Sequence, residues 1–159
     1  MKHYSVGPSS LTFAGRAFPY ITEDYVKIDD MIIIEKKWGT ETILPNTIDY
    51  TAKIMTLEPN AKVSMHMHNS KKESFILISG EMLIDVINLS NGTQETVELH
   101  EIGDSVTLEP NVPHSFYCPH TQIGLTVFVE CSTKDSPRDN YRFYPSQGPK
   151  DGNSRGFNN

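Results

Sequence analysis

Three side chains that can bind a metal ion lie close together in this sequence. His66 and His68 are two residues apart, and Glu73 follows after a short polar stretch. Alternate side chains of a β-strand point to the same face, so both histidines of one strand can enter a single cavity. Two imidazoles and one carboxylate leave coordination positions open for water or substrate, which is typical of a reactive metal site rather than a closed structural one.

A fourth candidate ligand, His114, follows a proline-bounded turn, residues 110–113. Such a turn at the head of a strand can bring one more imidazole to the same ion. We therefore predict one bound divalent metal ion with the ligands His66, His68, Glu73 and His114. Zinc, manganese, iron and nickel all suit a histidine-rich site, so the sequence leaves the choice among them open. The alternative is that these histidines are ordinary surface or core residues.

The elements that must position these ligands are short β-strands. They are rich in Val, Ile, Thr and Phe and often alternate in polarity. We predict them at residues 31–36, 50–57, 62–67, 74–79, 81–88, 94–100, 105–109, 114–117 and 122–131. Asn91-Gly92 between two strand patterns indicates a hairpin. Since no segment is typical of a helix of three turns, the expected fold class is all-β, a sandwich, jelly roll or small barrel.

Length and charge limit the classes of protein that remain. A chain of 159 residues fits one domain. The formal net charge of −6 disfavours nucleic acid or an anionic membrane as partner, because both require clustered Lys and Arg. Two cysteines form no disulfide framework, and neither a signal peptide nor a membrane-spanning stretch is apparent. A cytoplasmic protein with reduced thiols is the resulting expectation.

The expected organisation is a single barrel with an extension at each end. Residues 1–30, interrupted by Gly and Pro, form an N-terminal arm; residues 31–144 form the barrel. Residues 145–159 are rich in Gly, Asn and Ser and are predicted to be a flexible C-terminal tail. We expect a homodimer formed by edge-to-edge pairing of barrels, in which the arm can exchange between subunits.

The segments that carry the candidate metal ligands resemble two motifs of a known superfamily. The stretch over residues 66–80 reads HxHx4Ex6G and resembles the first cupin motif, with Asn60 where that family usually has glycine. Residues 103–114 resemble the second motif, although Pro110 comes one residue late and Val112 stands where glycine is usual. The resemblance implies a cupin double-stranded β-helix, that is, a jelly-roll barrel with an interior metal ion.

A narrower resemblance covers roughly residues 31–144. Trp38-Gly39 and Lys53 are similar to an opening segment and a lysine-bearing strand of type II mannose-6-phosphate isomerase cupins. Residues 64–73 resemble the ligand motif of that family, with His66 in place of a Gln and Lys71 in place of an Arg. Two later segments, residues 129–133 and 139–143, also resemble it. The implied substrate is a small sugar or sugar phosphate.

Isomerisation of a sugar moves a proton between carbons next to a carbonyl, and it needs a Lewis acid and a base. Glu73 and Lys71 are the candidate catalytic residues. Lys53, Lys71 and Arg142 are candidate substrate-binding groups, with Trp38 as a surface on which a sugar ring can stack. The alternatives are that the three cations are solvated surface charges and that Trp38 covers one end of the barrel.

Two other function classes remain open at this point. One is an iron-dependent cupin dioxygenase, because a His-rich set with open positions suits iron and dioxygen as well. The other is a non-catalytic cupin that binds a sugar or small molecule. Oxygen consumption marks the first class, and affinity without turnover marks the second.

Overall fold

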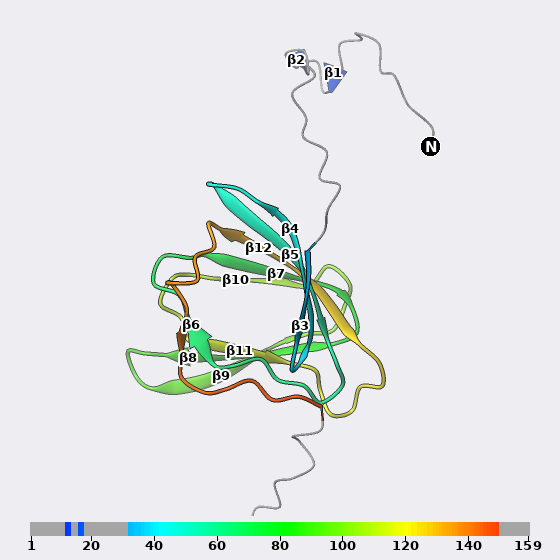
Figure 1. The fold of residues 1–159 in the computed structure, drawn as a ribbon, viewed down its shortest axis with the longest axis vertical. Helices are drawn as coiled ribbons and strands as arrows, with labels where there is room; N and C mark the ends of the chain where they lie inside the picture. The colour runs from blue at the N-terminus through cyan, green and yellow to red at the C-terminus, as the bar shows by residue number, and fades with distance from the viewer. Residues whose placement is uncertain (1–11, 14–15, 18–31, 150–159) are drawn as a thin grey trace, which may run out of the picture.

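Two antiparallel sheets face each other in the computed structural model, which describes residues 12–13, 16–17 and 32–149 (Figure 1). The six-stranded sheet has the order β10-β7-β12-β5-β4-β3 and the five-stranded sheet the order β13-β6-β11-β8-β9. The strands of the first sheet are β3 (Ile32–Lys36), β4 (Gly39–Asn46), β5 (Tyr50–Leu57), β7 (Glu73–Ser79), β10 (Ser105–Leu108) and β12 (Thr126–Thr133). Those of the second are β6 (His66–Met67), β8 (Met82–Asn88), β9 (Thr93–Leu99), β11 (His114–Tyr117) and β13 (Tyr141–Arg142).

The described part of the chain contains no helix, and hence none long and apolar enough to span a membrane. A two-stranded pair, β1 (Thr12–Phe13) with β2 (Arg16–Ala17), completes the described elements. The predicted all-β fold class is thereby confirmed, with a single domain built from two facing sheets.

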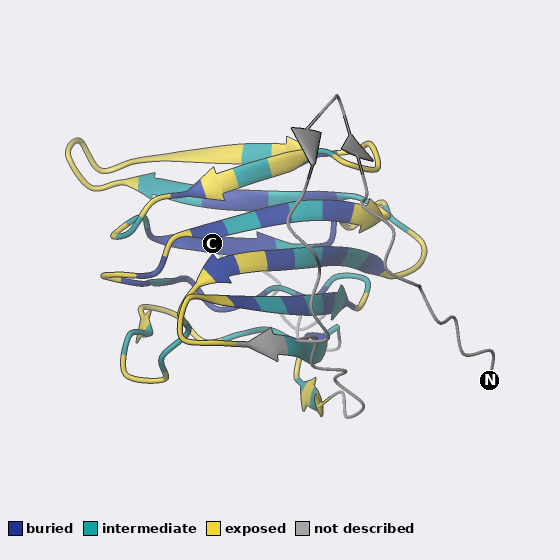
Figure 2. Cartoon of the chain, turned by 90° about the horizontal axis from the view of Figure 1, so that it is seen from above, coloured by how far each residue is buried: buried dark blue, intermediate teal, exposed yellow. Residues whose placement is uncertain are grey.

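Alternation of polarity explains why these segments become strands. On β12, Thr126, Phe128 and Glu130 are buried whereas the residues between them are partly exposed, and Figure 2 shows the same alternation along neighbouring strands. The inward rows form the core, in which the rings of Phe75, Phe116 and Phe128 lie 5.1–6.0 Å apart between centroids. Burial of each such side chain contributes about 1.5–3 kcal/mol.

Several predicted strands agree closely with the structure. Residues 50–57 and 114–117 are strands as predicted, and Asn91-Gly92 turns β8 into β9 with Gly92 at a φ of 73°. The segment 62–67 is different: only its last two residues form a strand, preceded by an isolated bridge at Lys62.

Strand β4 was not among the predicted elements. It forms a hairpin with β3 and pairs with β5 on its other side. Its first residue is Gly39, where a Cβ atom would lie 1.9 Å from the carbonyl oxygen of Thr56, at a φ of 141°. Only glycine permits this close approach, so the Trp38-Gly39 pair begins a strand packed tightly on β5.

Two asparagines in the segments that resemble the motifs have a left-handed backbone. Asn60 has a φ of 64° and Asn111 a φ of 67°, both in the left-handed region that asparagine tolerates better than other side chains. Asn60 can therefore occupy this turn without a glycine. In the second motif the residue with the left-handed backbone is Asn111, which directly precedes Val112.

The chain after β12 returns to the five-stranded sheet. There β13 pairs with β6, and Lys62 and Gln147 exchange two backbone hydrogen bonds of 2.8 and 3.0 Å. Ser146 adds a hydroxyl that accepts from the Ser64 amide. Residues 145–149, assigned by sequence to a flexible tail, are thus tied to the barrel. The rest of that predicted tail, and most of the predicted N-terminal arm, lie outside the described residues.

Candidate metal centre

The four predicted metal ligands meet between the two sheets. His66 on β6 and His114 on β11 are direct cross-strand partners, so both imidazoles enter the interior from the five-stranded sheet. His68 follows at the end of β6, and Glu73 begins β7 of the opposite sheet. All four side chains are buried. The fold therefore brings together from two sheets what the spacing predicted.

Backbone carbonyls hold all three imidazole rings by the same nitrogen. The Nδ1 atom of His66 lies 2.7 Å from the carbonyl oxygen of Ser64, and that of His114 lies 2.9 Å from that of Val112. The Nδ1 atom of His68 bonds the carbonyl oxygen of Asp139. Because a carbonyl only accepts, each Nδ1 carries the proton, and each Nε2 keeps its lone pair for a metal ion.

Two of the free ring nitrogens, those of His68 and His114, lie beside Glu73. Its Oε2 atom is 3.4 Å from Nε2 of His114, and its Oε1 atom is 3.7 Å from Nε2 of His68. Nε2 of His114 is buried and has no hydrogen-bond partner among the described residues, which is unusual for a buried polar atom. Ligands about 2.0–2.2 Å from one ion lie roughly 3–3.5 Å apart, so this pair is spaced for a shared metal.

The donor set is not arranged as a complete metal site. Among residues 32–149 and the short N-terminal pair, no three His, Cys, Asp or Glu side chains are placed so as to hold an ion as they stand. Glu73 is instead engaged by Lys71, whose Nζ atom lies 2.7 Å from Oε1. The unpartnered Nε2 of His114 and the shared tautomer of the three rings nevertheless fit a divalent ion.

Burial keeps two of the imidazoles uncharged. Burial, reinforced by the neighbouring His114, lowers the pKa of His66 to about 3. Burial likewise lowers the pKa of His114 to about 4, against the weaker opposing effect of its bond to Val112. Both rings are therefore in the unprotonated form that binds metal ions near neutral pH.

Opposite the histidines lies a group of buried and half-buried charges, which we call the ionic wall: Glu41, Lys53, Lys71, Glu73, Glu130 and Asp135. Nζ of Lys53 lies 2.7 Å from Asp135, 2.9 Å from Glu41 and 3.7 Å from Glu130. Nζ of Lys71 lies 2.6 Å from Glu130. The side chains of Lys53, Lys71 and Glu130 are at most 8% exposed. The alternative reading of the two lysines as surface charges is therefore wrong.

The carboxylates keep both lysines charged. Burial alone disfavours an ammonium group, but the negative charge of Glu130 and further carboxylate contacts outweigh it and raise the pKa of Lys53 and of Lys71. Lysine contacts in turn overcome burial at Asp135 and Glu41 and lower the pKa of each carboxyl group. The ionic wall is thus a set of mutually stabilised ions.

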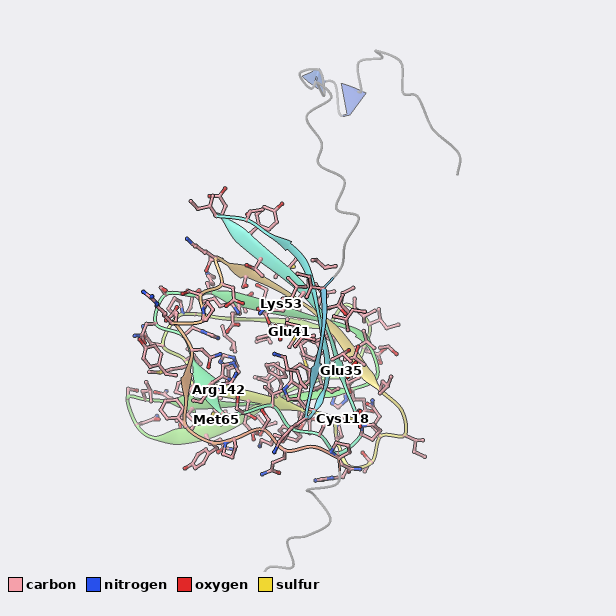
Figure 3. The ribbon with its side chains drawn as sticks, viewed as in Figure 1. Glu35, Glu41, Lys53, Met65, Cys118 and Arg142 are labelled. Carbon is pink, nitrogen blue, oxygen red and sulfur yellow. The ribbon has the colours of Figure 1, made fainter. Side chains whose placement is uncertain are left out.

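A cavity of about 820 Å³ opens onto this centre. Every candidate substrate-binding residue lines it: Trp38, Lys53, Lys71 and Arg142. In Figure 3, Lys53 and Glu41 lie by the six-stranded sheet, whereas Arg142 lies by the five-stranded one. Trp38 is also packed into the apolar core, so it closes part of the barrel and borders the cavity.

The loop between His68 and Lys71 is held by Asp139. Its carboxylate accepts from the amides of Asn69 and Ser70 at 2.7 and 3.0 Å and from the Ser70 hydroxyl at 2.6 Å. Its carbonyl oxygen bonds His68. Although segment 139–143 was noted for its resemblance, this positioning role was not predicted.

Sequence reasoning also missed Glu41, Glu130 and Asp135. Glu130 carried a readable signal, since it occupies an inward position in the alternating row that contains Thr126, Phe128 and Ser132. A charged residue in such a row requires a buried partner. The partners Lys53 and Lys71 are far away in sequence, and no local pattern identifies them.

The geometry defines a class: a small antiparallel β-barrel whose interior carries histidines and a carboxylate. Residues 53–130 match the family model described as "Cupin domain". No curated protein has a sequence similar enough to match it.

Solved structures agree on the fold. The capsular polysaccharide assembling protein CapF from Staphylococcus aureus superposes with a TM-score of 0.62 at 19% identity, over 72% of this chain and 33% of CapF. Oxalate decarboxylase of Lactobacillus farciminis gives 0.60 at 16%, over 76% and 38%. Oxalate decarboxylase of Bacillus subtilis, described with Mn(II) centres, gives 0.59 at 18%, over 72% and 30%. The chain spans about a third of each, and the likeness shows the fold alone.

Proposed function

We propose that this cupin domain is a divalent-metal-dependent isomerase of a small sugar. The observation that carries the proposal is the meeting, in one cavity, of His66, His68 and Glu73 with the buried Lys71–Glu130 pair. His114 lies directly behind, as the cross-strand partner of His66. Aldose–ketose isomerisation needs a Lewis acid at the sugar oxygens and a proton carrier near the carbon. The cavity offers candidates for both on facing walls.

The residues that would hold the ion are His66, His68, His114 and Glu73. When bound there, a divalent ion supplies a Lewis acid that polarises carbonyl and hydroxyl oxygens. The Mn(II) centres of the Bacillus subtilis oxalate decarboxylase make manganese a first choice to test, along with zinc, iron and nickel.

The remaining groups bind the substrate and move the proton. Lys71 lies within 2.7 Å of carboxylate oxygens of both Glu73 and Glu130, so a proton can pass between these groups without a change of fold. Lys71 and Glu73, the predicted catalytic pair, both border the cavity. Arg142 and Trp38 border it as well and are available to sugar hydroxyls and to a ring face.

The proposal is tested by incubating the protein with a panel of aldoses and their phosphates in D2O, with each divalent metal in turn. The expected result is conversion to the ketose with deuterium incorporation next to the carbonyl, observed by NMR. Chelator and the His68→Ala variant should abolish it. Absence of exchange for every sugar and metal would rule out the isomerase.

A second candidate is an iron-dependent dioxygenase, supported by the grouping of histidines with Glu73, a donor set that also suits iron and dioxygen. An oxygen electrode with the iron-loaded protein tests it. Sugar affinity without turnover or oxygen uptake would identify a binding module instead.

The homodimer predicted from sequence is part of the proposal. Strand β3 is an edge of the six-stranded sheet, and Ile32 and Ile33 on it are 59% and 60% exposed. An apolar sheet edge is suited to pairing with another copy. Light scattering should give twice the chain mass of 17.9 kDa; the mass of one chain would refute the dimer.

A further inference from the structure

Both lysines inside the cavity are already paired with carboxylates. Lys53 has three of them within 3.7 Å, and Lys71 has Glu73 and Glu130 within 2.7 Å. Each ammonium group has at most three N–H donors, and these are directed to carboxylate oxygens. A phosphate could gain these donors only by displacing buried ion-pair partners.

The charge of the ionic wall points the same way. Two lysines and four carboxylates sum to +2 − 4 = −2. Lys36, near the same wall, is likewise paired, with its Nζ 2.8 Å from Glu41. A phosphate monoester carries about −1.5 to −2 at neutral pH, so the ionic wall would repel it. The full cavity lining, with five basic and five acidic side chains, offers it no net attraction.

The aromatic part of the cavity wall suits a neutral ring. Trp38, Phe116, Phe143 and Tyr144 line the cavity, and the last two are 50% and 68% exposed. Aromatic faces pack against the C–H faces of a sugar, while buried carboxylates and ammonium groups hydrogen-bond its hydroxyls. Phosphate gains nothing from an aromatic face.

We infer that the cavity selects an uncharged sugar over its phosphate ester, because Glu130 and Asp135 neutralise the only two lysines buried in the described part of the cavity wall. That the ligand is a sugar rests on the proposed function, whereas the exclusion of phosphate rests on the ion pairs alone. Lys53 and Lys71 are then hydroxyl donors and positioning residues, and the two carboxylates determine specificity.

The test is a calorimetric titration of inorganic phosphate into the full chain at low ionic strength, with metal removed so that phosphate cannot bind an ion. For the wild type we expect a Kd weaker than about 10 mM. Glu130→Gln removes one negative charge between the two lysines and should tighten phosphate binding at least ~10-fold. Glu109→Gln is the matched control, because Glu109 is an exposed carboxylate paired with Lys72 and does not line the cavity.

Two results would overturn the inference. Wild-type phosphate binding in the millimolar range or tighter, weakened by Arg142→Gln or Lys53→Gln, would mean that the cavity accepts the anion. If circular dichroism shows that Glu130→Gln is folded and phosphate binding is no tighter than in the wild type, this carboxylate does not mask the lysines. Should Glu130→Gln fail to fold, Asp135→Asn serves the same purpose at a more exposed position, 27% for the side chain.

Failure of the proposed function would look different. If no sugar is isomerised, the enzyme proposal falls while the phosphate titration still stands. If phosphorylated aldoses are isomerised with lower KM than the free aldoses, the enzyme proposal holds and the neutral-substrate inference falls.

Discussion

Two groups face each other at the candidate site and are positioned in different ways. One is the set His66, His68 and His114, which we call the histidine wall, and the other is the ionic wall. On the five-stranded sheet, His66 and His114 are oriented by main-chain carbonyls no more than two residues away in sequence. On the six-stranded sheet, Lys71 is held by Glu130, 59 residues later, and Lys53 by Asp135, 82 residues later. The imidazoles of His66 and His114 are positioned locally by the backbone, whereas the ions position one another. The first wall should therefore tolerate loss of a neighbour, and the second should not.

The largest expected effect on metal binding comes from substitution in the histidine wall. It lowers the affinity for the metal ion rather than the stability of the fold. His68→Ala removes a candidate ligand, and metal affinity should fall at least ~100-fold, since even loss of a group that only supports a ligand costs 10–100-fold. Elemental analysis of protein purified without chelator measures it, with His100→Ala, an exposed histidine outside the cavity, as control. Full metal occupancy in His68→Ala would contradict the ligand assignment.

The ionic wall should fail by unfolding. Lys71→Met leaves Glu73 and Glu130 buried with fewer counter-charges, and the free energy of unfolding should fall by about 3–5 kcal/mol. Denaturant titration gives the value. Lys72 follows Lys71 in sequence and forms an exposed ion pair with Glu109. Lys72→Met breaks this pair and should lower the free energy of unfolding by at most about 1 kcal/mol. Equal effects of the two substitutions would erase the contrast between the walls.

Acid should weaken the histidine wall first. In the metal-free protein the pKa of His66 is about 3 and that of His114 about 4, against 6.5 for an ordinary histidine. The unfolded chain therefore takes up protons first as pH falls below 6.5, and stability decreases, by up to about 2 kcal/mol per histidine at pH 5. This window lies above the lowered pKa values of Glu41 and Asp135.

The measurement is denaturant unfolding at pH 7 and pH 5 in the presence of chelator. Exposed His100, whose pKa is raised mainly by its hydrogen bond to Glu98, acts in the opposite direction, so His100→Ala serves as the background for comparison. His66→Gln should flatten the dependence. A stability that does not change between these pH values would mean that the rings are not buried as uncharged groups.

The smallest expected effect concerns the turn before His114. Asn111 has a left-handed backbone, so Asn111→Ala should cost about 1 kcal/mol of stability and Asn111→Gly less than about 0.5 kcal/mol. Thermal unfolding measures both. An alanine variant as stable as the glycine variant would show that the turn does not need this conformation.

Most of what the sequence predicted was local. The spacing of His66, His68 and Glu73 and the His114 turn identified the candidate ligands, because strand alternation and a nearby turn determine where such side chains point. The strand at residues 50–57 was predicted for the same reason.

What could not be predicted depends on pairing between distant segments. Strand β4 contains Pro45 and reads weakly as a strand, yet it pairs with strands on both sides. The partners of Lys53 and Lys71 are fixed by the adjacency of β5, β7 and β12, which no local pattern contains. The ion pairs of the ionic wall could therefore not be predicted from local sequence, although the inward position of Glu130 on β12 indicated a buried charge.

The bond from His68 to the carbonyl of Asp139 has a consequence for how the protein is made. The ring of one candidate ligand takes its orientation from a residue 71 positions later, beyond the last strand of the six-stranded sheet. During synthesis the chain appears from its N-terminus, so the barrel strands can emerge and pair while this histidine is still unrestrained. The site is completed only when the segment around Asp139 has left the ribosome. Under the proposed function, capture of the metal ion would then be a late event, which follows assembly of the barrel instead of guiding it.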